Sequence, residues 1–309
     1  MPLDYHQLKS TRFDALHHRY GADDCILYAL GVGAGLGDPD AFGDEIEYLY
    51  EDGIRALPSM VSVIAYQGFW MRDPAHGIDW RKVVHGEQRM TLFGPLPASG
   101  SVVSRSCVTR VTDKGERGGA VVAVERCIFD EASERCLARI EQVNVCRGDG
   151  GYSVGDSLLS DTPLPPIPSP PERRPDETLR MPTARNQAAI YRLTGDRNPL
   201  HIDPESARKA GLDAPILHGA SMAGIATRAV LRRPPLGGEC FVSQIDIRFT
   251  GMAYPGRSVD VECWLGADRT AFRCLEADTH RELAFGHVVW ELESATGTGL
   301  ETEYAEQAD

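Results

Sequence analysis

The chain has 309 residues, of which 42% are hydrophobic, and a formal net charge of −13 at pH 7. This length is enough for one large core or two medium cores. An acidic protein repels nucleic acids and anionic membranes, so we expect neither as a partner. No apolar run approaches the length of a membrane span, which excludes a transmembrane class.

The eight cysteines form no C-x-x-C pair and have no histidine partners at zinc spacing. They predict buried, reduced thiols and no metal site. The sequence shows no apolar leader after Met1, and its last residues, EQAD, are not a peroxisomal signal. We therefore expect a cytoplasmic location.

The N-terminal half begins with a polar stretch, residues 1–20, which we expect to be partly helical. Asp23 and Asp24 then predict the start of a helix that runs to Leu30. From residue 82 onward the hydrophobic pattern has a period of two, which is typical of strands. The predicted strands are 87–93, 100–112, 120–129 and 136–147.

Prolines concentrate between residues 160 and 176, SDTPLPPIPSPPERRPD. Such a segment is extended and stiff, so we expect a connector rather than a packed element. It predicts an N-terminal domain at 1–155, a linker at 156–177, a C-terminal domain at 178–295 and a disordered tail at 296–309.

The C-terminal half repeats the plan of the first. A helix is predicted at 220–233, followed by strands at 241–249, 257–265, 269–277 and 283–292. In the first of these strands Phe241, Ser243, Ile245, Ile247 and Phe249 alternate with more polar residues and predict its apolar face. A helix followed by four antiparallel strands, occurring twice, predicts an α+β double hot-dog fold.

The densest group of reactive residues lies between two predicted helices. One helix covers residues 186–193 and ends near Gly195, and the next starts at the Asp203 cap. The loop between them carries Asp196, Asn198 and His201. An imidazole and a carboxylate together can hold a water molecule and move protons.

A second feature is the sequence PILHG at 215–219, directly before the helix at 220–233. Backbone N–H groups at Gly219 then lie at a helix N-terminus, where they favour an oxygen that gains negative charge. The same residue types also fit structural roles. Asn198 fits an Asx turn, His201 a cap and His218 a core position, and we assign Asp203 to capping.

The stretch Tyr191–Gly219, with its GD-x-NP-L-H-x-D-P core, resembles the MaoC-like, (R)-specific 2-enoyl-CoA hydratases (hydratase 2). The resemblance extends to YALGVGAG at 28–35, YE at 50–51 and HGEQ at 85–88, as in the two-repeat members. It implies reversible hydration of trans-2-enoyl-CoA to (3R)-3-hydroxyacyl-CoA by a hydro-lyase. The family also implies an N-terminal repeat with a degenerate central helix, and a homodimer.

The resemblance assigns roles to individual residues. Asp196 and His201 hold the water, Asn198 orients it and Gly219 binds the thioester oxygen. Glu51 is expected at the site, with His85, Glu87 and Gln88 as support. No metal or redox cofactor is required. An acyl-CoA is itself anionic, so a local basic patch is needed, for which the candidates are Arg89, Arg232 and Arg233. A hot-dog acyl-CoA thioesterase and a non-catalytic acyl-thioester-binding subunit stay open as alternatives.

Overall fold

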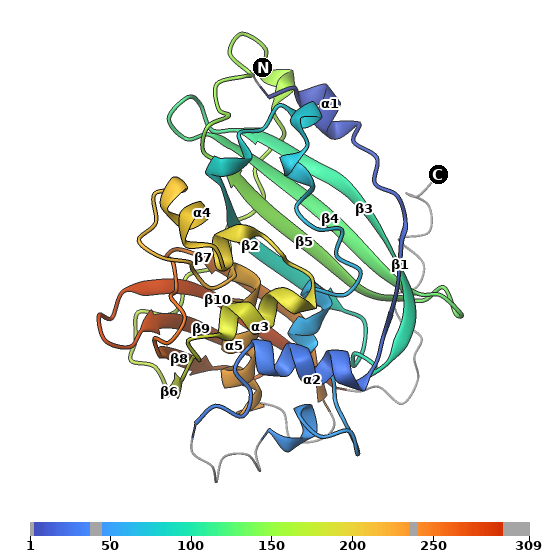
Figure 1. Cartoon of the computed structure of the whole chain (residues 1–309), viewed down its shortest axis with the longest axis vertical. Coiled ribbons are helices and arrows are strands. Elements are labelled where there is room, and N and C mark those ends of the chain that lie inside the picture. Colours follow the sequence, from blue (N-terminus) through green and yellow to red (C-terminus); the bar gives the residue numbers. More distant parts are fainter. Residues whose placement is uncertain (1–2, 38–44, 235–239, 293–309) are drawn as a thin grey trace.

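The computed structural model describes residues 3–37, 45–234 and 240–292, so the tail predicted at 296–309 lies outside the described residues. Within these ranges ten strands form one sheet, in the order β1-β3-β4-β5-β2-β7-β10-β9-β8-β6. Every neighbouring pair is antiparallel. The two halves of the chain meet in the middle of the sheet, where β2 pairs with β7 (Figure 1).

The two halves use their strands in the same order outward from this central pair. The N-terminal strands are β1 (Leu16–Tyr20), β2 (Val83–Leu92), β3 (Gly100–Asp113), β4 (Ala120–Asp130) and β5 (Cys136–Cys146). The C-terminal strands are β6 (Glu177–Met181), β7 (Cys240–Phe249), β8 (Val259–Leu265), β9 (Arg269–Glu276) and β10 (Glu282–Leu292). Thus β1 corresponds to β6, β2 to β7, and each following strand to its counterpart.

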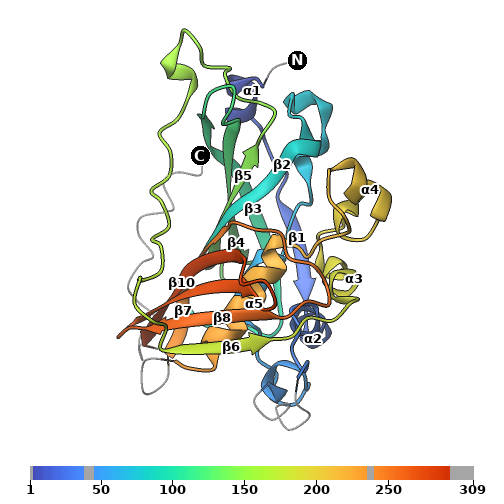
Figure 2. The same ribbon diagram turned by 90° about the vertical axis from the view of Figure 1, so that its left-hand side faces the viewer.

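One long helix is enclosed by the C-terminal half of the sheet (Figure 2). This helix, α5 (Gly219–Leu231), has ten buried residues and contacts β6, β7, β8, β9 and β10. The corresponding place in the N-terminal half holds only a 3-10 turn, Pro58–Ser62, followed by the buried Val63–Ala65. The central helix of the first repeat is therefore degenerate. The other helices are α1 (Tyr5–Lys9), α2 (Ala22–Gly31), α3 (Gln187–Tyr191) and α4 (Pro204–Lys209).

The eight long strands agree with the predicted ones, but two short strands were missed. The lead-in predicted to be partly helical contains α1 and also β1, and β6 begins at the end of the predicted linker. Both have five residues and lie at sheet edges, with sequences LHHRY and ETLRM. Because an edge strand buries little, it carries too few apolar residues for a clear alternation.

The predicted apolar face of β7 is wrong at its first residues. Ile245 and Ile247 are buried as expected, but Val242 is in the core and Phe241 is only partly buried. The register with β10 shifts at this point, because Val242 pairs with Trp290 and Gln244 with Val289. Ser243 is the extra residue of a bulge, which turns the preceding side chains to the opposite face.

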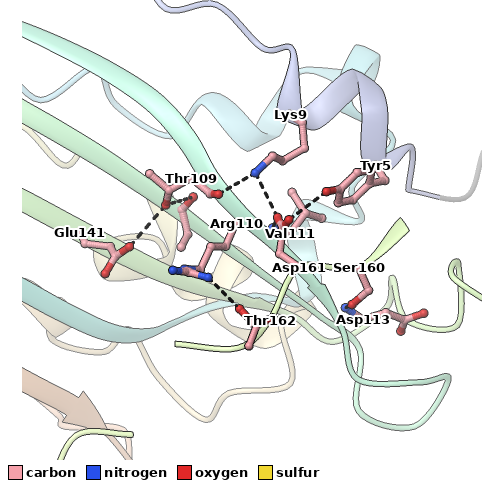
Figure 3. A network of polar contacts seen from close by, with 11 residues as sticks. Tyr5, Lys9, Thr109, Arg110, Val111, Asp113, Glu141, Ser160, Asp161 and Thr162 are labelled. Atoms are coloured by element: carbon pink, nitrogen blue, oxygen red, sulfur yellow. Dashed lines mark hydrogen bonds and ion pairs between the residues drawn. The ribbon is translucent and has the colours of Figure 1, made fainter. Parts of the chain in front are cut away.

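The linker is extended but is held on the sheet. After a 3-10 turn at Ser157–Leu159 it has no helix or strand before β6, and it runs down the outer side of the molecule (Figure 2). Asp161 accepts hydrogen bonds from Tyr5 Oη (2.9 Å), Lys9 Nζ (3.1 Å) and Val111 N (2.7 Å), which joins the linker to α1 and β3 (Figure 3). Ile167 is 4% exposed. Residues 160–176 thus contain no helix or strand, as expected, but the segment is also packed against the first repeat.

In the described part of the chain no helix has the length and apolarity to cross a bilayer. All eight cysteines are reduced thiols. Cys25, Cys146, Cys263 and Cys274 are buried as predicted, whereas Cys107 is exposed and the other three are partly exposed.

Candidate active site

The loop after α3 is fixed by its own side chains. The chain passes through Gly195, whose φ of 149° suits glycine, and reaches Asp196. Asp196 Oδ1 accepts a hydrogen bond from Asn198 N (3.1 Å), and Asn198 Oδ1 accepts one from Leu200 N (3.1 Å). Asp203 caps α4 as predicted, accepting from Ser206 N (2.9 Å). The loop geometry is therefore set before any ligand binds.

Three side chains converge at this loop: Asp196, His201 and His218. One nitrogen atom of each histidine and one carboxylate oxygen of Asp196 lie within 4.8 Å of one another. Both histidines are buried and Asp196 is half-buried. The structure thus brings together Asp196 and His201, and it adds His218, which we expected to be only a core residue.

Hydrogen bonds to backbone carbonyls orient both imidazoles. His201 Nδ1 donates to Ile216 O (2.9 Å), and His218 Nε2 donates to Asp196 O (3.1 Å). His201 Nε2 is then left as a proton acceptor. Burial lowers the pKa of His201, although the nearby Asp196 carboxylate opposes this shift. Burial, together with the neighbouring His201, lowers the pKa of His218 to about 2. Both rings are therefore neutral at pH 7.

The three residues are close enough to be considered as ligands of one metal ion. The two imidazoles, however, are stacked, with centroids 3.6 Å apart and planes at 27°. A nitrogen lone pair lies in the plane of its own ring, so two nearly parallel rings do not direct their lone pairs at one point. The arrangement suits proton transfer better than metal binding.

Gly219 lies at the N-terminus of α5, directly beside this group. The first hydrogen bond of the helix joins Met222 N to His218 O, so the N–H groups of residues 219–221 precede it. A methyl group at Gly219 would come within 3.3 Å of both His85 Nδ1 and the Phe249 ring. A side chain at this position would therefore be tightly packed. The short distance also places His85 of the N-terminal repeat at the helix end.

A bulge in β2 places the predicted supporting residues of the HGEQ segment in different positions relative to the site. His85 lies at the site, and burial, with a smaller effect of His201, lowers its pKa to about 4. The register of β2 with β5 shifts between His85 and Glu87. Glu87 pairs instead with Arg89 (2.7 Å) and the exposed Arg248 (3.0 Å), away from Asp196.

Two further predicted residues have different positions. Gln88 is buried on the inner side of β2, and its Oε1 has no hydrogen-bond partner in the described structure. Glu51 lies in an exposed turn at 51–53 and does not belong to the group formed by Asp196, His201 and His218. The family role of Glu51 stays a prediction.

A groove of about 1010 Å³ runs past His201. Its lining contains Arg185, Arg257 and Arg281. The last two contact Glu276, at 2.7 and 3.4 Å. None of the three was among the expected basic residues. Those pair elsewhere: Arg89 with Glu87, Arg232 with Glu45 and Arg233 with Glu177.

Several side chains near the site were missed from the sequence. Tyr191 is buried and its ring lies 4.8 Å from that of His218. Tyr66 lies close to Gly195, because a methyl group there would be 3.9 Å from Tyr66 Cδ1. Tyr191 and His218 could have been found from the sequence, because they lie at the two ends of the motif Tyr191–Gly219. For Tyr66, which follows the apolar run 61–65, there was no such signal.

Comparisons with known proteins show the family of the chain. Residues 166–283 match the family model described as MaoC like domain, and residues 18–148 match the one described as MFE-2 hydratase 2 N-terminal domain. The chain is 30% identical over 293 residues to enoyl-CoA hydratase 2, peroxisomal, of Arabidopsis thaliana, covering 92% of each chain. The chain belongs to the MaoC-like hydratase family.

This MaoC-like chain is also 32% identical over 295 residues to peroxisomal multifunctional enzyme type 2 of Drosophila melanogaster, covering 92% of the chain and 48% of the relative. The solved structure of that enzyme has a TM-score of 0.69 at 31% identity, over 89% of this chain and 48% of the relative. The MaoC-like chain therefore spans about half the length of this multifunctional relative.

A more distant likeness concerns the fold alone. A Mycobacterium tuberculosis protein described as having a double hotdog fold shares 12% identity with the MaoC-like chain, at a TM-score of 0.51. The match covers 94% of this chain and 98% of the other. Together with the solved multifunctional enzyme it confirms the predicted double hot-dog class.

Proposed function

We propose that this chain is a hydro-lyase that adds water reversibly to a trans-2-enoyl thioester, giving a (3R)-3-hydroxyacyl thioester. One observation carries the proposal. Asp196 and His201 lie together beside the N-terminus of α5, at the edge of a large groove. The named activities of relatives such as enoyl-CoA hydratase 2 support the same reaction.

Coenzyme A is the thioester carrier that we propose. The groove that passes His201 contains three arginines in an otherwise acidic protein. Arginine side chains bind phosphate oxygens with several N–H donors at once. Arg185, Arg257 and Arg281 can therefore hold the phosphates of coenzyme A while the thioester reaches His201.

The reaction divides between the loop and the helix. A water molecule lies between Asp196 and His201, and its oxygen forms the bond to C3. The pair accepts one proton from this water and delivers one to C2 on the same face, so atoms and charge balance. The π electrons of the C2–C3 bond pass transiently to the thioester oxygen, which the N–H of Gly219 stabilises. Asn198 donates from its amide group to the water or the new hydroxyl. No step requires a metal or a redox cofactor.

Incubation with crotonyl-CoA tests the proposal. Hydration removes the conjugated double bond, so the enoyl absorbance falls while no free thiol is released. A thioesterase would release free thiol, and a non-catalytic binding protein would change neither signal. Loss of absorbance without thiol supports hydration, and either other result contradicts it.

Variants assign the activity to the loop. We expect His201→Ala and Asp196→Asn each to lower kcat by about 10²-fold or more, as for loss of a general acid or base. His17→Ala is the matched control, because His17 is an exposed histidine on β1. Near-normal rates in both loop variants would remove these residues from the active site.

We also propose a homodimer, on the basis of the family resemblance. Light scattering during size-exclusion chromatography measures the mass in solution directly. A mass near twice 33.8 kDa supports the dimer, and a mass near 33.8 kDa contradicts it.

A further inference from the structure

A buried arginine without an acidic partner lies in the N-terminal repeat. Arg126 is 5% exposed and points inward from β4, in phase with the buried Val122, Val124 and Ile128. Its Nη2 donates to Val61 O (3.0 Å) and Ser62 O (2.7 Å). Its Nε has no partner, and no carboxylate contacts Arg126 in the described structure. The positive charge is therefore buried without a counter-charge.

Further polar side chains line the inner face between Arg126 and the active site. On β2 they are His85 and Gln88, and on β5 they are Gln142 and Asn144. His85 pairs in register with Asn144, and Gln88 with Gln142. Gln142 Nε2 donates to Asn144 Oδ1 (3.1 Å), and Gln88 Oε1 lacks a partner. We call Arg126 and these four residues the polar belt.

A small cavity opens onto the belt. It has a volume of about 20 Å³, and its lining includes Arg126, Gln142, Asn144 and Tyr66. This is enough for about one small polar group. Tyr66 lines this cavity and also lies close to Gly195 of the catalytic loop. Arg126 Cζ lies 5.3 Å from the centroid of the Tyr66 ring. Burial, and to a smaller extent the negative charge of Asp196, raises the pKa of Tyr66.

A structural role does not account for the charge of Arg126. Capping the carbonyls of Val61 and Ser62 requires only a neutral donor. Burial lowers the pKa of Arg126 to about 10, so the side chain is still protonated at pH 7. A buried charge is costly unless it is paired, and an arginine pairs best with a carboxylate through charge-assisted hydrogen bonds.

We propose that the substrate is a trans-2-enoyl thioester whose chain ends in a carboxylate, that the far end of this chain enters the cavity beside Arg126, and that Arg126 binds the carboxylate. The inference rests on the proposed hydratase function and narrows its substrate class. The reacting bond is still C2–C3, so the carboxylate is recognised and not changed. Gln142 and Asn144 of the polar belt also line the cavity, so their amide groups would face the carboxylate end of the acyl chain.

A matched pair of substrates tests the proposal: trans-2-hexenoyl-CoA and its analogue with a carboxylate in place of the terminal methyl group. We expect the unmodified protein to hydrate the carboxylate analogue with a kcat/KM at least about tenfold higher, as one charge-assisted pair provides. Arg126→Met should abolish this preference and leave hydration of hexenoyl-CoA unchanged or faster. Arg126→Lys should retain part of it.

Arg105→Met is the control, because Arg105 is exposed on the neighbouring strand β3. It should keep the preference intact. If Arg126→Met does not fold, the ratio of kcat/KM for the carboxylate analogue to kcat/KM for hexenoyl-CoA still tests the proposal. This ratio is then measured with the unmodified protein and with Arg126→Lys. Equal or better hydration of hexenoyl-CoA by the unmodified protein overturns the carboxylate proposal alone. Hydration of neither substrate overturns the proposed function instead.

Discussion

The imidazole of His218 is stacked on that of His201, with ring centroids 3.6 Å apart. The same His218 donates from Nε2 to the backbone oxygen of Asp196 (3.1 Å). One side chain thus holds both members of the proposed catalytic pair. It does so while neutral, because burial keeps its pKa far below 7.

This contact predicts graded effects of substitution at His218. His218→Phe keeps a flat ring against His201 but loses the hydrogen bond, and we expect kcat to fall by about tenfold, roughly the value of one hydrogen bond. His218→Ala also leaves a cavity beside both residues and should cost more. Measurement of kcat and KM checks the order. If His218→Ala had unchanged kcat with normal folding, His218 would not position the pair.

The pH dependence of activity follows from the buried state of His201. Its pKa is lowered, so His201 stays neutral below the ordinary histidine value of about 6.5. Activity that needs a neutral imidazole is then retained at pH 6.5 and is lost only as the pH falls through the lower value. We expect the acid limb of kcat/KM against pH below about 6.5. A limb at or above that value would contradict a buried, neutral His201.

Stretches with strong local patterns could be predicted from the sequence. The caps at Asp203 and Gly195 fix the loop that carries Asp196 and His201, because capping depends on a few neighbouring residues. The long strands were predictable because each alternates over many residues. Arg126 was also accessible in principle, since it falls in phase with the apolar residues of β4.

Features that depend on distant partners were not predictable. The bulge at Ser243 arises from the register between β7 and β10. The stacking of His218 on His201 joins residues from two separate segments through the tertiary fold. Likewise, Glu87 turns away from the site because of a bulge beside Gly86. A motif shows which residues occur together, whereas the register decides which of them face inward.

Gly219→Ala should lower activity without unfolding the protein. The added methyl group would come within 3.3 Å of His85 Nδ1 and the Phe249 ring, so these side chains or the helix end must give by a few tenths of an ångström. Since one oxyanion donor is worth about 10²-fold in kcat, we expect kcat to fall by up to that factor. Gly21→Ala is the control, because no atom lies within 4 Å of the added group. Unchanged kcat in Gly219→Ala would argue against the oxyanion role.

Glu45→Gln should destabilise the fold through α5. Glu45 Oε1 accepts from Arg228 Nε (3.1 Å), and both side chains are buried. Breaking a buried pair leaves an uncompensated charge, at a cost of about 3–5 kcal/mol in the free energy of unfolding. Glu47→Gln, which removes an exposed pair with Arg55, should cost less than about 1 kcal/mol. Urea denaturation of both variants measures the difference, and equal losses would refute it.

Asp161→Asn should loosen the linker from the first repeat. Burial acts to raise the pKa of Asp161, but hydrogen bonds from Val111, Tyr5 and Lys9 outweigh this effect and lower it (Figure 3). The stabilisation is therefore present above the unfolded value of about 3.9 and is lost as the pH falls through the folded value. We expect Asp161→Asn to reduce the free energy of unfolding at pH 7 by about 1–3 kcal/mol.

The exposed Glu172 of the same linker supplies the control, Glu172→Gln, which should leave stability unchanged. The difference between Asp161→Asn and the unmodified protein should also shrink as the pH falls below about 3.9, because the carboxylate becomes protonated in both states. Thermal unfolding at pH 7 and at a series of acidic pH values measures this convergence. A difference that stays constant at all pH values would mean that the charge of Asp161 does not hold the linker to α1 and β3.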